Sequence, residues 1–282
     1  MQGDLPCLKN AMATHLDQIV EHTRQVVAQR KAAADYKQIE VHAAAHTPRG
    51  FARALRSAAQ QGPAIIAELK KASPSRGLIR DPFEVEPLAK GLAAAGAAAL
   101  SVLTEEKFFQ GSLQNLSLAS AAVSIPCLRK DFMVDALQVL EARAHGADAI
   151  LLIAAALNDA ELRLLADAAH AIGLDVLCEV HDGEELDRVA QLGADAYGVN
   201  SRNLKTFNVT LDTALELVRL LPRDAVKVAE SGIHTREDLN RLQAAGYEAF
   251  LIGESLMRRP DPGQALAELL APSFAVEGTA AV

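Results

Sequence analysis

The sequence has no tryptophan, only three cysteines, and few aromatic residues of any kind. Its core must therefore consist mainly of Ala, Leu, Val and Ile, a composition typical of buried parallel strands covered by Ala-rich helices. The cysteines Cys7, Cys127 and Cys178 are odd in number and unrelated in spacing, which argues against a disulfide framework. No Cys-x-x-Cys or Cys/His ligand spacing is present, so no metal site is predicted. Cys127 and Cys178 lie in apolar runs and are expected to be buried as small hydrophobic residues in a reducing compartment.

Long apolar spans and excess positive charge are also missing. No stretch of about 18 apolar residues occurs, and no basic segment followed by an apolar one opens the chain, so neither a membrane span nor a secretory signal is predicted. The net charge is −8 and no run of Lys or Arg offsets it, which argues against a general nucleic-acid surface. We therefore expect a soluble, cytoplasmic protein that binds neither nucleic acid nor membrane. Any anionic ligand must be held by a local cluster of positive groups.

The chain does contain a repeated unit. Four segments, centred on Gly96, Gly146, Gly193 and Gly246, each combine the end of a helical pattern, a glycine that can end the helix, and an apolar strand. Another strand and helix fit between successive glycines, which makes the basic period about 25 residues. Eight strands are thus predicted, near 64–70, 98–103, 125–130, 148–153, 174–179, 195–200, 225–230 and 248–253.

Eight strands joined by helical crossovers must be parallel, and they predict an α/β fold, the closed (β/α)8 TIM barrel, which takes about 250 residues. A doubly wound open sheet is the alternative, but it rarely has eight near-equal units, and no Gly-x-Gly-x-x-Gly follows the first strand. Helices are predicted over 11–34 and 48–61, where they either cap the bottom of the barrel or fold over its top. We divide the chain into an N-terminal helical extension (1–61), a catalytic barrel domain (62–272) and a C-terminal tail (273–282).

Charged residues mark the ends of alternate strands. The first strand ends in Glu68 and Lys70, which share one face, and the third, fifth and seventh end in Lys130, Glu179 and Glu230. Alternate strands contribute to the same layer of a barrel interior, and active sites lie at the carboxyl ends of the strands, so all five groups are expected to meet at one mouth. They could instead be structural ion pairs, but two amines and three acids at matched positions favour proton transfer. A lysine can act as an acid near neutral pH if burial or a neighbouring positive charge lowers its pKa.

A phosphate site is predicted beside these charges. Ser231 and Gly232 follow the seventh strand, and Gly253 and Glu254 follow the eighth, where small residues let backbone N–H groups approach an anion. Ser73, in the turn after the first strand, adds a hydroxyl donor. The alternative is that the two glycines only permit tight turns, but their occurrence together favours a phosphate.

The segments that carry these residues resemble one known family. They are AELKKASPSRG, LSVLTEEKFFQGS, LRKDFMVD, CEVHD, GVNSRNL, AESGI and FLIGESLMR, in that order. They closely resemble the indole-3-glycerol phosphate synthase family of tryptophan biosynthesis. The resemblance implies a carboxy-lyase that closes the ring of 1-(2-carboxyphenylamino)-1-deoxy-D-ribulose 5-phosphate to give indole-3-glycerol phosphate, CO₂ and water. No cofactor is expected, because the nitrogen lone pair makes the ring carbon nucleophilic and closure precedes decarboxylation.

The resemblance also implies roles for the charged residues. Lys130 resembles the general acid that protonates the ketone oxygen, and Glu179 the group that removes a proton and orients the anilino nitrogen. Lys70 with Glu68 resembles the pair that assists the later dehydration. Glu230 is expected to order Lys130 and the substrate hydroxyls. Which amine serves which step stays open, because coupled groups share their protons.

Further residues are expected around the substrate. Asn200 and Arg202 approach the ring and its carboxylate. The even strands and the loops supply an apolar slot for the ring, or else ordinary core, formed by Leu103, Leu151, Ile153, Phe109 and Phe132. The partner is a phosphorylated small molecule, and other enzymes of tryptophan biosynthesis are candidate protein partners.

Two other functions are possible for a phosphate-binding barrel. One is a different phosphate-binding barrel of aromatic amino-acid synthesis, such as phosphoribosylanthranilate isomerase or the tryptophan synthase α subunit, which would not be expected to carry this Lys/Glu set. The other is a non-catalytic sugar-phosphate-binding protein that has kept the barrel. Such a protein would be expected to lack one of the acids or bases, whereas all of them are present here.

Overall fold

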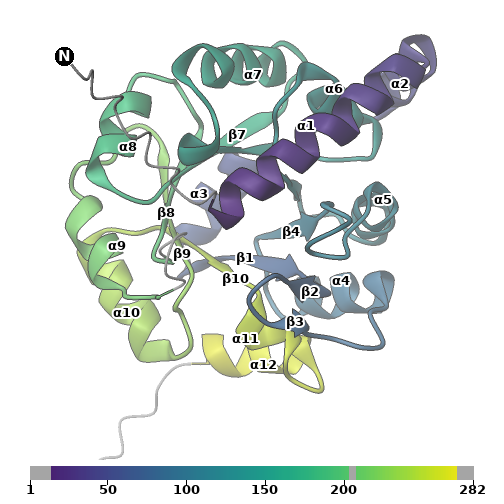
Figure 1. Cartoon of the computed structure of the whole chain (residues 1–282). Coiled ribbons are helices and arrows are strands. Elements are labelled where there is room, and N and C mark those ends of the chain that lie inside the picture. Colours follow the sequence, from purple (N-terminus) through teal and green to yellow (C-terminus); the bar gives the residue numbers. More distant parts are fainter. Residues whose placement is uncertain (1–13, 203–207, 272–282) are drawn as a thin grey trace, which may run out of the picture.

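The computed structural model describes residues 14–202 and 208–271. Its first elements are the helices α1 (His15–Ala33), α2 (Tyr36–Ala45) and α3 (Phe51–Ala59). Helix α1 begins at a capping box, in which the Thr14 hydroxyl accepts a hydrogen bond from the Asp17 N–H and the Asp17 carboxylate accepts one from the Thr14 N–H. Figure 1 shows α1 running across the front of the molecule, with α2 continuing to its side and α3 behind it.

A closed barrel of parallel strands forms the centre of the molecule (Figure 1). Each strand pairs with the next along the chain, and β10 pairs with β1 to close the ring. The strands are β1 (Ala64–Leu69), β4 (Ala99–Leu103), β5 (Cys127–Lys130), β6 (Ala149–Ile153), β7 (Asp175–Val180), β8 (Ala196–Asn200), β9 (Val226–Glu230) and β10 (Ala249–Ile252). The predicted (β/α)8 TIM barrel is confirmed, and each strand lies within two residues of its predicted position.

Helices surround the barrel on the outside (Figure 1). They are α4 (Val85–Ala94), α5 (Leu113–Ala122), α6 (Ala136–Ala144), the 3₁₀ turn η1 (Ala154–Ala156), α7 (Asp159–Ala171), α8 (Gly183–Val189), α9 (Asp212–Leu217), α10 (Arg236–Ala245), α11 (Glu254–Met257) and α12 (Pro262–Leu270). A small antiparallel hairpin, β2 (Ala72–Ser73) and β3 (Gly77–Leu78), stands between β1 and α4.

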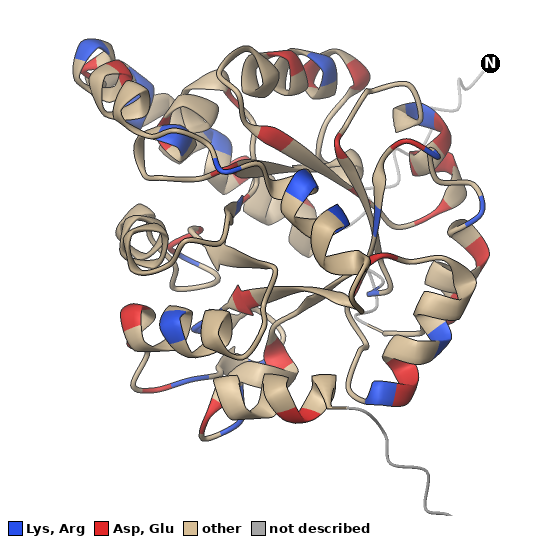
Figure 2. Ribbon diagram, turned by 180° about the vertical axis from the view of Figure 1, so that it is seen from behind, with Lys and Arg blue, Asp and Glu red and all other residues tan. Residues whose placement is uncertain are grey.

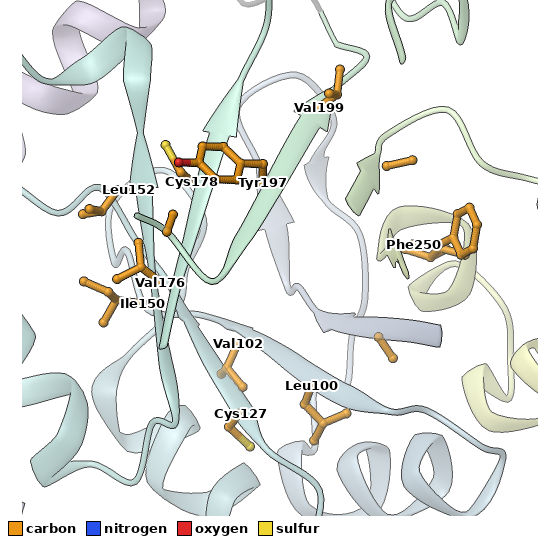
Figure 3. Close-up of a cluster of buried hydrophobic side chains, with 14 of the residues drawn as sticks. Leu100, Val102, Cys127, Ile150, Leu152, Val176, Cys178, Tyr197, Val199 and Phe250 are labelled. Atoms are coloured by element: carbon orange, nitrogen blue, oxygen red, sulfur yellow. The ribbon is translucent and has the colours of Figure 1, made fainter. Parts of the chain in front are cut away.

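The alternation of side chains along each strand produces two separate cores. Outward residues such as Leu100 and Val102 pack against the helices, in a cluster that includes Cys127, Cys178 and Tyr197 (Figure 3). Both cysteines are buried and unpaired, as expected from the apolar runs that contain them. The inward residues form the second cluster, inside the barrel.

Helix α3 closes the bottom of the barrel. Phe51 and Leu55 are fully buried and pack with the inward residues at the starts of the strands, among them Ala64, Ala149 and Ala249. Seen from behind, α3 lies across the centre of the barrel (Figure 2). The small alanine side chains leave the space that the phenyl ring of Phe51 fills. Of the two placements considered for the N-terminal helices, α3 therefore adopts the one at the bottom.

A buried ion pair attaches α3 to the bottom of the barrel. The Asp148 side chain is fully buried at the start of β6, and its Oδ2 accepts a hydrogen bond of 2.6 Å from the Arg49 guanidinium just before α3. The same guanidinium donates to the backbone carbonyls of Ser120, Val123 and Gly146. Because its charge and its donors are both satisfied, the pair can be buried at an acceptable cost.

Three details of the N-terminal half differ from expectation. The helix predicted over 48–61 is α3, somewhat shorter, and the helix predicted over 11–34 is α1, which begins at His15; residues 11–13 lie outside the described part. Helix α2 was not predicted, because its Ala-rich sequence follows α1 with only Asp35, its N-cap, as a boundary signal. The β2–β3 hairpin was not predicted either, because two-residue strands carry no readable alternation. The tail assigned to 273–282 lies outside the described residues.

Candidate active site

The carboxyl ends of the strands surround a cavity of about 360 Å³. Every residue predicted for the site lines it. They are Glu68, Lys70, Ser73, Phe109, Lys130, Phe132, Leu151, Glu179, Asn200, Arg202, Glu230, Ser231, Gly232, Gly253 and Glu254. The two predicted apolar neighbours Leu103 and Ile153 line it as well. Strand ends from all around the barrel therefore face one space large enough for a single small molecule.

Lys130 is the centre of the charge cluster. Its Nζ lies 2.7 Å from Oε2 of Glu179 and 3.1 Å from Oε2 of Glu230. All three side chains are largely buried, with 13% of the Lys130 side chain exposed and less of the two glutamates. The Glu230 carboxylate fits because β8 carries Gly198 opposite it; a Cβ at Gly198 would overlap Oε1 of Glu230. The ammonium thus connects the ends of β5, β7 and β9 across the mouth.

A second ion pair lies at the end of β1. The Nζ of Lys70 donates to Oε1 of Glu68 at 2.5 Å, and the Glu68 side chain is only 5% exposed. Gly253, at the end of β10, makes room for it, because a Cβ there would collide with the Glu68 carboxylate. Glu68 also contributes to the electrostatic field at Lys130, so the two pairs act on each other.

The pKa values follow from this crowding. Burial by itself lowers the pKa of Lys130, but the carboxylates of Glu179, Glu230 and Glu68 outweigh it and raise the pKa above its ordinary value. The pKa of Lys130 is therefore not lowered by burial, because three acids surround the amine. Burial raises the pKa of Glu230 to about 8, against the opposing effect of Lys130 and with the help of Glu179. For Glu179 the attraction of Lys130 and of His181 exceeds the cost of burial, and its pKa is held well below the usual range.

The part of the cavity at the ends of β9 and β10 contains the residues predicted to bind a phosphate. Ser231 and Gly232 both have left-handed backbone conformations, with φ of 67° and 78°, which turn the chain sharply after β9. The Ser73 hydroxyl is buried and has no hydrogen-bond partner among the described residues. Around Glu254, guanidinium groups gather from three elements: Arg76 Nε lies 3.1 Å away, Arg258 Nε 3.1 Å and Arg202 NH2 3.7 Å. This side is thus rich in positive charge although the chain as a whole is acidic.

An apolar wall completes the cavity. The rings of Phe109 and Phe132 lie 6.0 Å apart at a tilt of 38°, and Leu151 stands on the neighbouring strand β6. Helix α1 adds Leu16 and Ile19 from above, so the first helix covers part of the mouth. A flat aromatic group can be held between such surfaces away from water.

Comparison with known proteins identifies the family. Residues 16–269 match the family model described as indole-3-glycerol phosphate synthase. The chain belongs to the indole-3-glycerol phosphate synthase family. It is 60% identical over 259 residues to indole-3-glycerol phosphate synthase of Koribacter versatilis (strain Ellin345), which covers 92% of this chain and 100% of the relative. The protein of that name from Albidiferax ferrireducens (strain ATCC BAA-621 / DSM 15236 / T118) is 50% identical over 262 residues, 92% of this chain and 99% of the relative.

Solved structures support the fold alone. The 3-hexulose-6-phosphate synthase from Salmonella typhimurium superposes with a TM-score of 0.59 at 12% identity, over 73% of this chain and 98% of the other. KGPDC from Streptococcus mutans gives a TM-score of 0.57 at 11% identity, over 74% of this chain and 96% of the other. The family match, not these barrels, separates the indole-3-glycerol phosphate synthase family from the other phosphate-binding barrels considered above.

Several residues of the site were not predicted from the sequence. Helix α1 contributes His15, Leu16 and Ile19, which no local pattern could assign to a site formed far along the chain. Arg76 and His234 also line the cavity, from the loops after β1 and β9. His181 was visible in the segment CEVHD, but the direction of its side chain could not be inferred from the sequence.

The described residues, 14–202 and 208–271, contain neither a metal-binding cluster nor a membrane-spanning helix. No group of three or more His, Cys, Asp or Glu side chains among them is arranged to hold a metal ion. Nor does any helix in this part of the chain combine the length and the apolar character needed to cross a membrane. Acidic and basic residues alternate over the outer helices of the side shown in Figure 2, without a broad region of one sign.

Proposed function

We propose that this chain catalyses the conversion of 1-(2-carboxyphenylamino)-1-deoxy-D-ribulose 5-phosphate to indole-3-glycerol phosphate, CO₂ and water. The observation that carries the proposal is the Lys130 ammonium held between Glu179 and Glu230 at the mouth of a barrel of the indole-3-glycerol phosphate synthase family. The reaction needs an acid for an oxygen, a base for a proton and a dry slot for an aromatic ring. Each of these is available in the cavity.

Ring closure forms a bond between the carboxylate-bearing ring carbon and the ketone carbon of the sugar chain. The ketone oxygen gains negative charge as the bond forms, and Lys130 supplies its proton. A strongly held ammonium proton suits this role, because the group stays charged until an alkoxide, which is more basic, develops beside it. Glu179 accepts a hydrogen bond from the anilino nitrogen and keeps the ring in line for attack.

Loss of CO₂ then returns an electron pair to the ring. The last step removes water, which requires a proton on the leaving hydroxyl and the removal of one from the adjacent carbon. Lys70, paired with Glu68 at 2.5 Å, supplies the first proton, and ionised Glu179 removes the second. Glu230 holds Lys130 and the chain hydroxyls in register. Its Oε1 is buried against Gly198 without a hydrogen-bond partner among the described residues.

The phosphate and the ring of the substrate bind in different parts of the same cavity. The backbone amides near Ser231, Gly232, Gly253 and Glu254, together with the Ser73 hydroxyl, hold the phosphate. Asn200 and Arg202 approach the ring carboxylate, and the ring itself lies against the apolar wall of Phe109, Phe132 and Leu151. A titration calorimeter tests the phosphate assignment, since we expect the dephosphorylated substrate to bind at least roughly tenfold more weakly. Equal affinity of the two compounds would contradict it.

The surroundings of the reaction are part of the proposal. The steps above need neither a metal nor an organic cofactor, because the nitrogen lone pair activates the ring. We also propose a cytoplasmic location, which the two unpaired buried thiols Cys127 and Cys178 suit. An association with other enzymes of tryptophan biosynthesis stays a prediction.

The direct test is an activity assay. The purified chain is mixed with the carboxyphenylamino-deoxyribulose phosphate, and the absorbance and fluorescence of the indole product are followed, with CO₂ release as a second readout. We expect turnover by the protein without added metal, in the presence of a chelator. A protein that binds the substrate but releases neither indole nor CO₂ would instead be the non-catalytic sugar-phosphate binder.

A further inference from the structure

His181 occupies a position that the catalytic scheme does not use. It follows β7, two residues beyond Glu179, and its side chain is only 9% exposed. Its Nε2 lies 3.3 Å from Oε1 of Glu179, and its Nδ1 lies 3.1 Å from Oε2 of Glu185 on α8. Both ring nitrogens therefore face carboxylates, and only a doubly protonated imidazolium can offer a hydrogen to each. The contact between Nε2 and Glu179 does not have hydrogen-bond geometry in the described part of the chain, and it is an ion pair when the ring is protonated.

The ring is held in this orientation from the far side. Asp182 is the N-cap of helix α8, and its side chain accepts a hydrogen bond of 2.9 Å from the Glu185 N–H. The Glu185 carboxylate in turn accepts a hydrogen bond of 2.8 Å from the backbone N–H of His181 and faces the ring nitrogen of the same residue. The first turn of α8 thus fixes both the backbone and the imidazole of His181, and the ring cannot turn away from Glu179 without losing Glu185.

The charges around His181 and Glu179 come from five elements. Glu185 on α8 and Glu179 on β7 face the imidazole. Lys130 on β5, Glu230 on β9 and Glu68 on β1 act on the other side of Glu179. Arg188 on α8 is turned instead to Asp159 and the carbonyls of Ala154 and Leu157. Burial by itself lowers the pKa of His181, but its two carboxylate neighbours outweigh it and raise the pKa to about 10.

Glu179 consequently faces two cationic side chains, one at each carboxylate oxygen, whereas Glu230 faces one. Oε2 of Glu179 faces Lys130 and Oε1 faces His181, while Glu230 faces only Lys130 among the cations described. Two carboxylates that share one amine compete for the ionised state, and one of them takes up a proton. The second cation decides that competition in favour of Glu179.

We propose that His181, locked by Glu185, is a positioning residue that orients the Glu179 carboxylate and keeps it ionised for proton removal. The inference rests on the proposed function, in which Glu179 is the base. His181 touches neither the substrate nor the reacting atoms in this scheme. It acts through Glu179, and it separates the tasks of two neighbouring acids, with Glu179 as the base and Glu230 as the group that carries a proton.

The test compares the pH dependence of kcat in the wild type and in His181→Gln. Glutamine keeps a polar side chain but carries no charge, so the pKa of Glu179 should rise. We expect the acidic limb of the profile to move up by about one pH unit or more, and kcat at neutral pH to fall roughly 10- to 100-fold, with KM changed by less than about threefold. Glu185→Gln should move the limb in the same direction by less, because it loosens the imidazolium without removing it.

A matched histidine serves as control. His170 also pairs with a carboxylate, Asp195, at 2.9 Å, but on α7 beside the start of β8, at the opposite end of the barrel. His170→Gln should leave both kcat and the acidic limb unchanged. Nitrogen-15 NMR of the wild type at pH 8 needs no variant, and it should find both ring nitrogens of His181 protonated.

The outcomes separate this inference from the proposed function. If the wild type makes no indole product, the proposed function fails first. If the wild type turns over and His181→Gln keeps the wild-type acidic limb, the positioning role of His181 is wrong. Should the variant not fold, the NMR measurement decides: a neutral His181 ring at pH 8 overturns the inference, and a doubly protonated ring supports it.

Discussion

Lys130 lies at the centre of the buried charge cluster, paired with both Glu179 and Glu230. Burial alone would lower the pKa of the Lys130 ammonium, yet three carboxylates lie near enough to reverse that effect. The same three acids would repel one another if the ammonium were removed. A buried charge that loses its partner is costly, so the amine is important for the geometry of its neighbours as well as for proton transfer.

Replacement of Lys130 by alanine should therefore abolish most of the activity. We expect kcat to fall roughly 10²- to 10⁴-fold or more, because the general acid is lost and Glu179 and Glu230 are left facing each other. The indole assay gives the rate, and far-UV circular dichroism checks that the barrel is intact. Lys227→Ala, at the amino end of β9, is the control and should keep normal turnover. Near-normal activity of Lys130→Ala would remove this residue from the mechanism.

Glu230 leads to a prediction about stability and pH. Its pKa in the folded protein is about 8, above the ordinary value of 4.5, so the folded state holds a proton that the unfolded state lacks between these pH values. Stability must then fall as pH rises through this window. Glu230→Gln removes the titration, and the Tm of the variant relative to the wild type should increase from pH 5 to pH 8. A Tm difference that stays constant over this range, measured by differential scanning calorimetry, would contradict the prediction.

For single residues, the sequence was sufficient to predict that the charged groups meet at the mouth of the barrel. It was not sufficient to predict the direction in which their pKa values shift. The positions of Glu68, Lys130 and Glu179 at alternate strand ends brought them to one mouth, as the alternation rule requires. The sign of the Lys130 pKa shift depends on whether burial or the nearby acids dominate, and this balance is set by distances of a few ångströms. The role proposed for His181 needed the direction of a side chain, which a strand-end motif does not contain.

Among the strands, β8 has a glycine at the position that faces the Glu230 side chain of the neighbouring strand β9. Gly198 leaves the space that the Glu230 side chain occupies, and a methyl group there would overlap the carboxylate. Strand glycines usually weaken a sheet, so this one is retained for close approach. The site is therefore prepared by a residue with no chemistry of its own.

Gly198→Ala should displace Glu230 from Lys130. We expect a loss of roughly 1–3 kcal/mol of stability from overpacking and a decrease of kcat of about tenfold or more from the shifted carboxylate. Urea unfolding and the indole assay measure the two effects. Gly91→Ala is the control, because this helical glycine has open space around it and the exchange should stabilise α4 by about 0.5–1 kcal/mol. A fully active, unaltered Gly198→Ala protein would show that the space is not needed.

The elements that could be predicted are those with long, bounded patterns. Each barrel strand is an apolar run, often introduced by a glycine such as Gly146 or Gly246, which adopts a left-handed conformation at the helix end. Helix α2 and the β2–β3 hairpin escaped because they are short and are held by contacts with distant elements. For α2 the contacts are made mainly with α6, a helix that begins some ninety residues later, and such a contact has no local signature.

The two ends of the barrel differ: the carboxyl ends of the strands surround the charged cavity, and α3 closes the other end. Eight near-equal units were enough to predict the barrel, but not where the N-terminal helices would attach. The structure uses both ends: α3 fills the bottom, and α1 lies over part of the mouth. Attachment at the bottom depends on Arg49 and Asp148, which are 99 residues apart in the sequence and meet only in the folded chain.

Asp148→Ala should destabilise the entire molecule without changing its chemistry. Removal of the carboxylate leaves the Arg49 guanidinium without its buried counter-charge, at a cost of roughly 3–5 kcal/mol. We expect Tm to fall by about 5–15 °C while kcat at 25 °C stays within about twofold of the wild type. Glu86→Ala, which breaks an exposed pair with Lys90, is the control and should change stability by about 0.5 kcal/mol or less. A proportional loss of turnover in Asp148→Ala would show that the two ends of the barrel are coupled.

The Arg49–Asp148 ion pair and the Lys130 cluster lie at opposite ends of the barrel, and their separation has an evolutionary consequence. The packed interior of the barrel stands between them, so tolerance to heat or cold can be adjusted at one end while the chemistry is conserved at the other. A descendant of this chain in a warmer or cooler habitat could therefore adapt by exchanging residues under α3, with its reaction unchanged. Selection for a new substrate would act on a different set of positions, at the opposite rim.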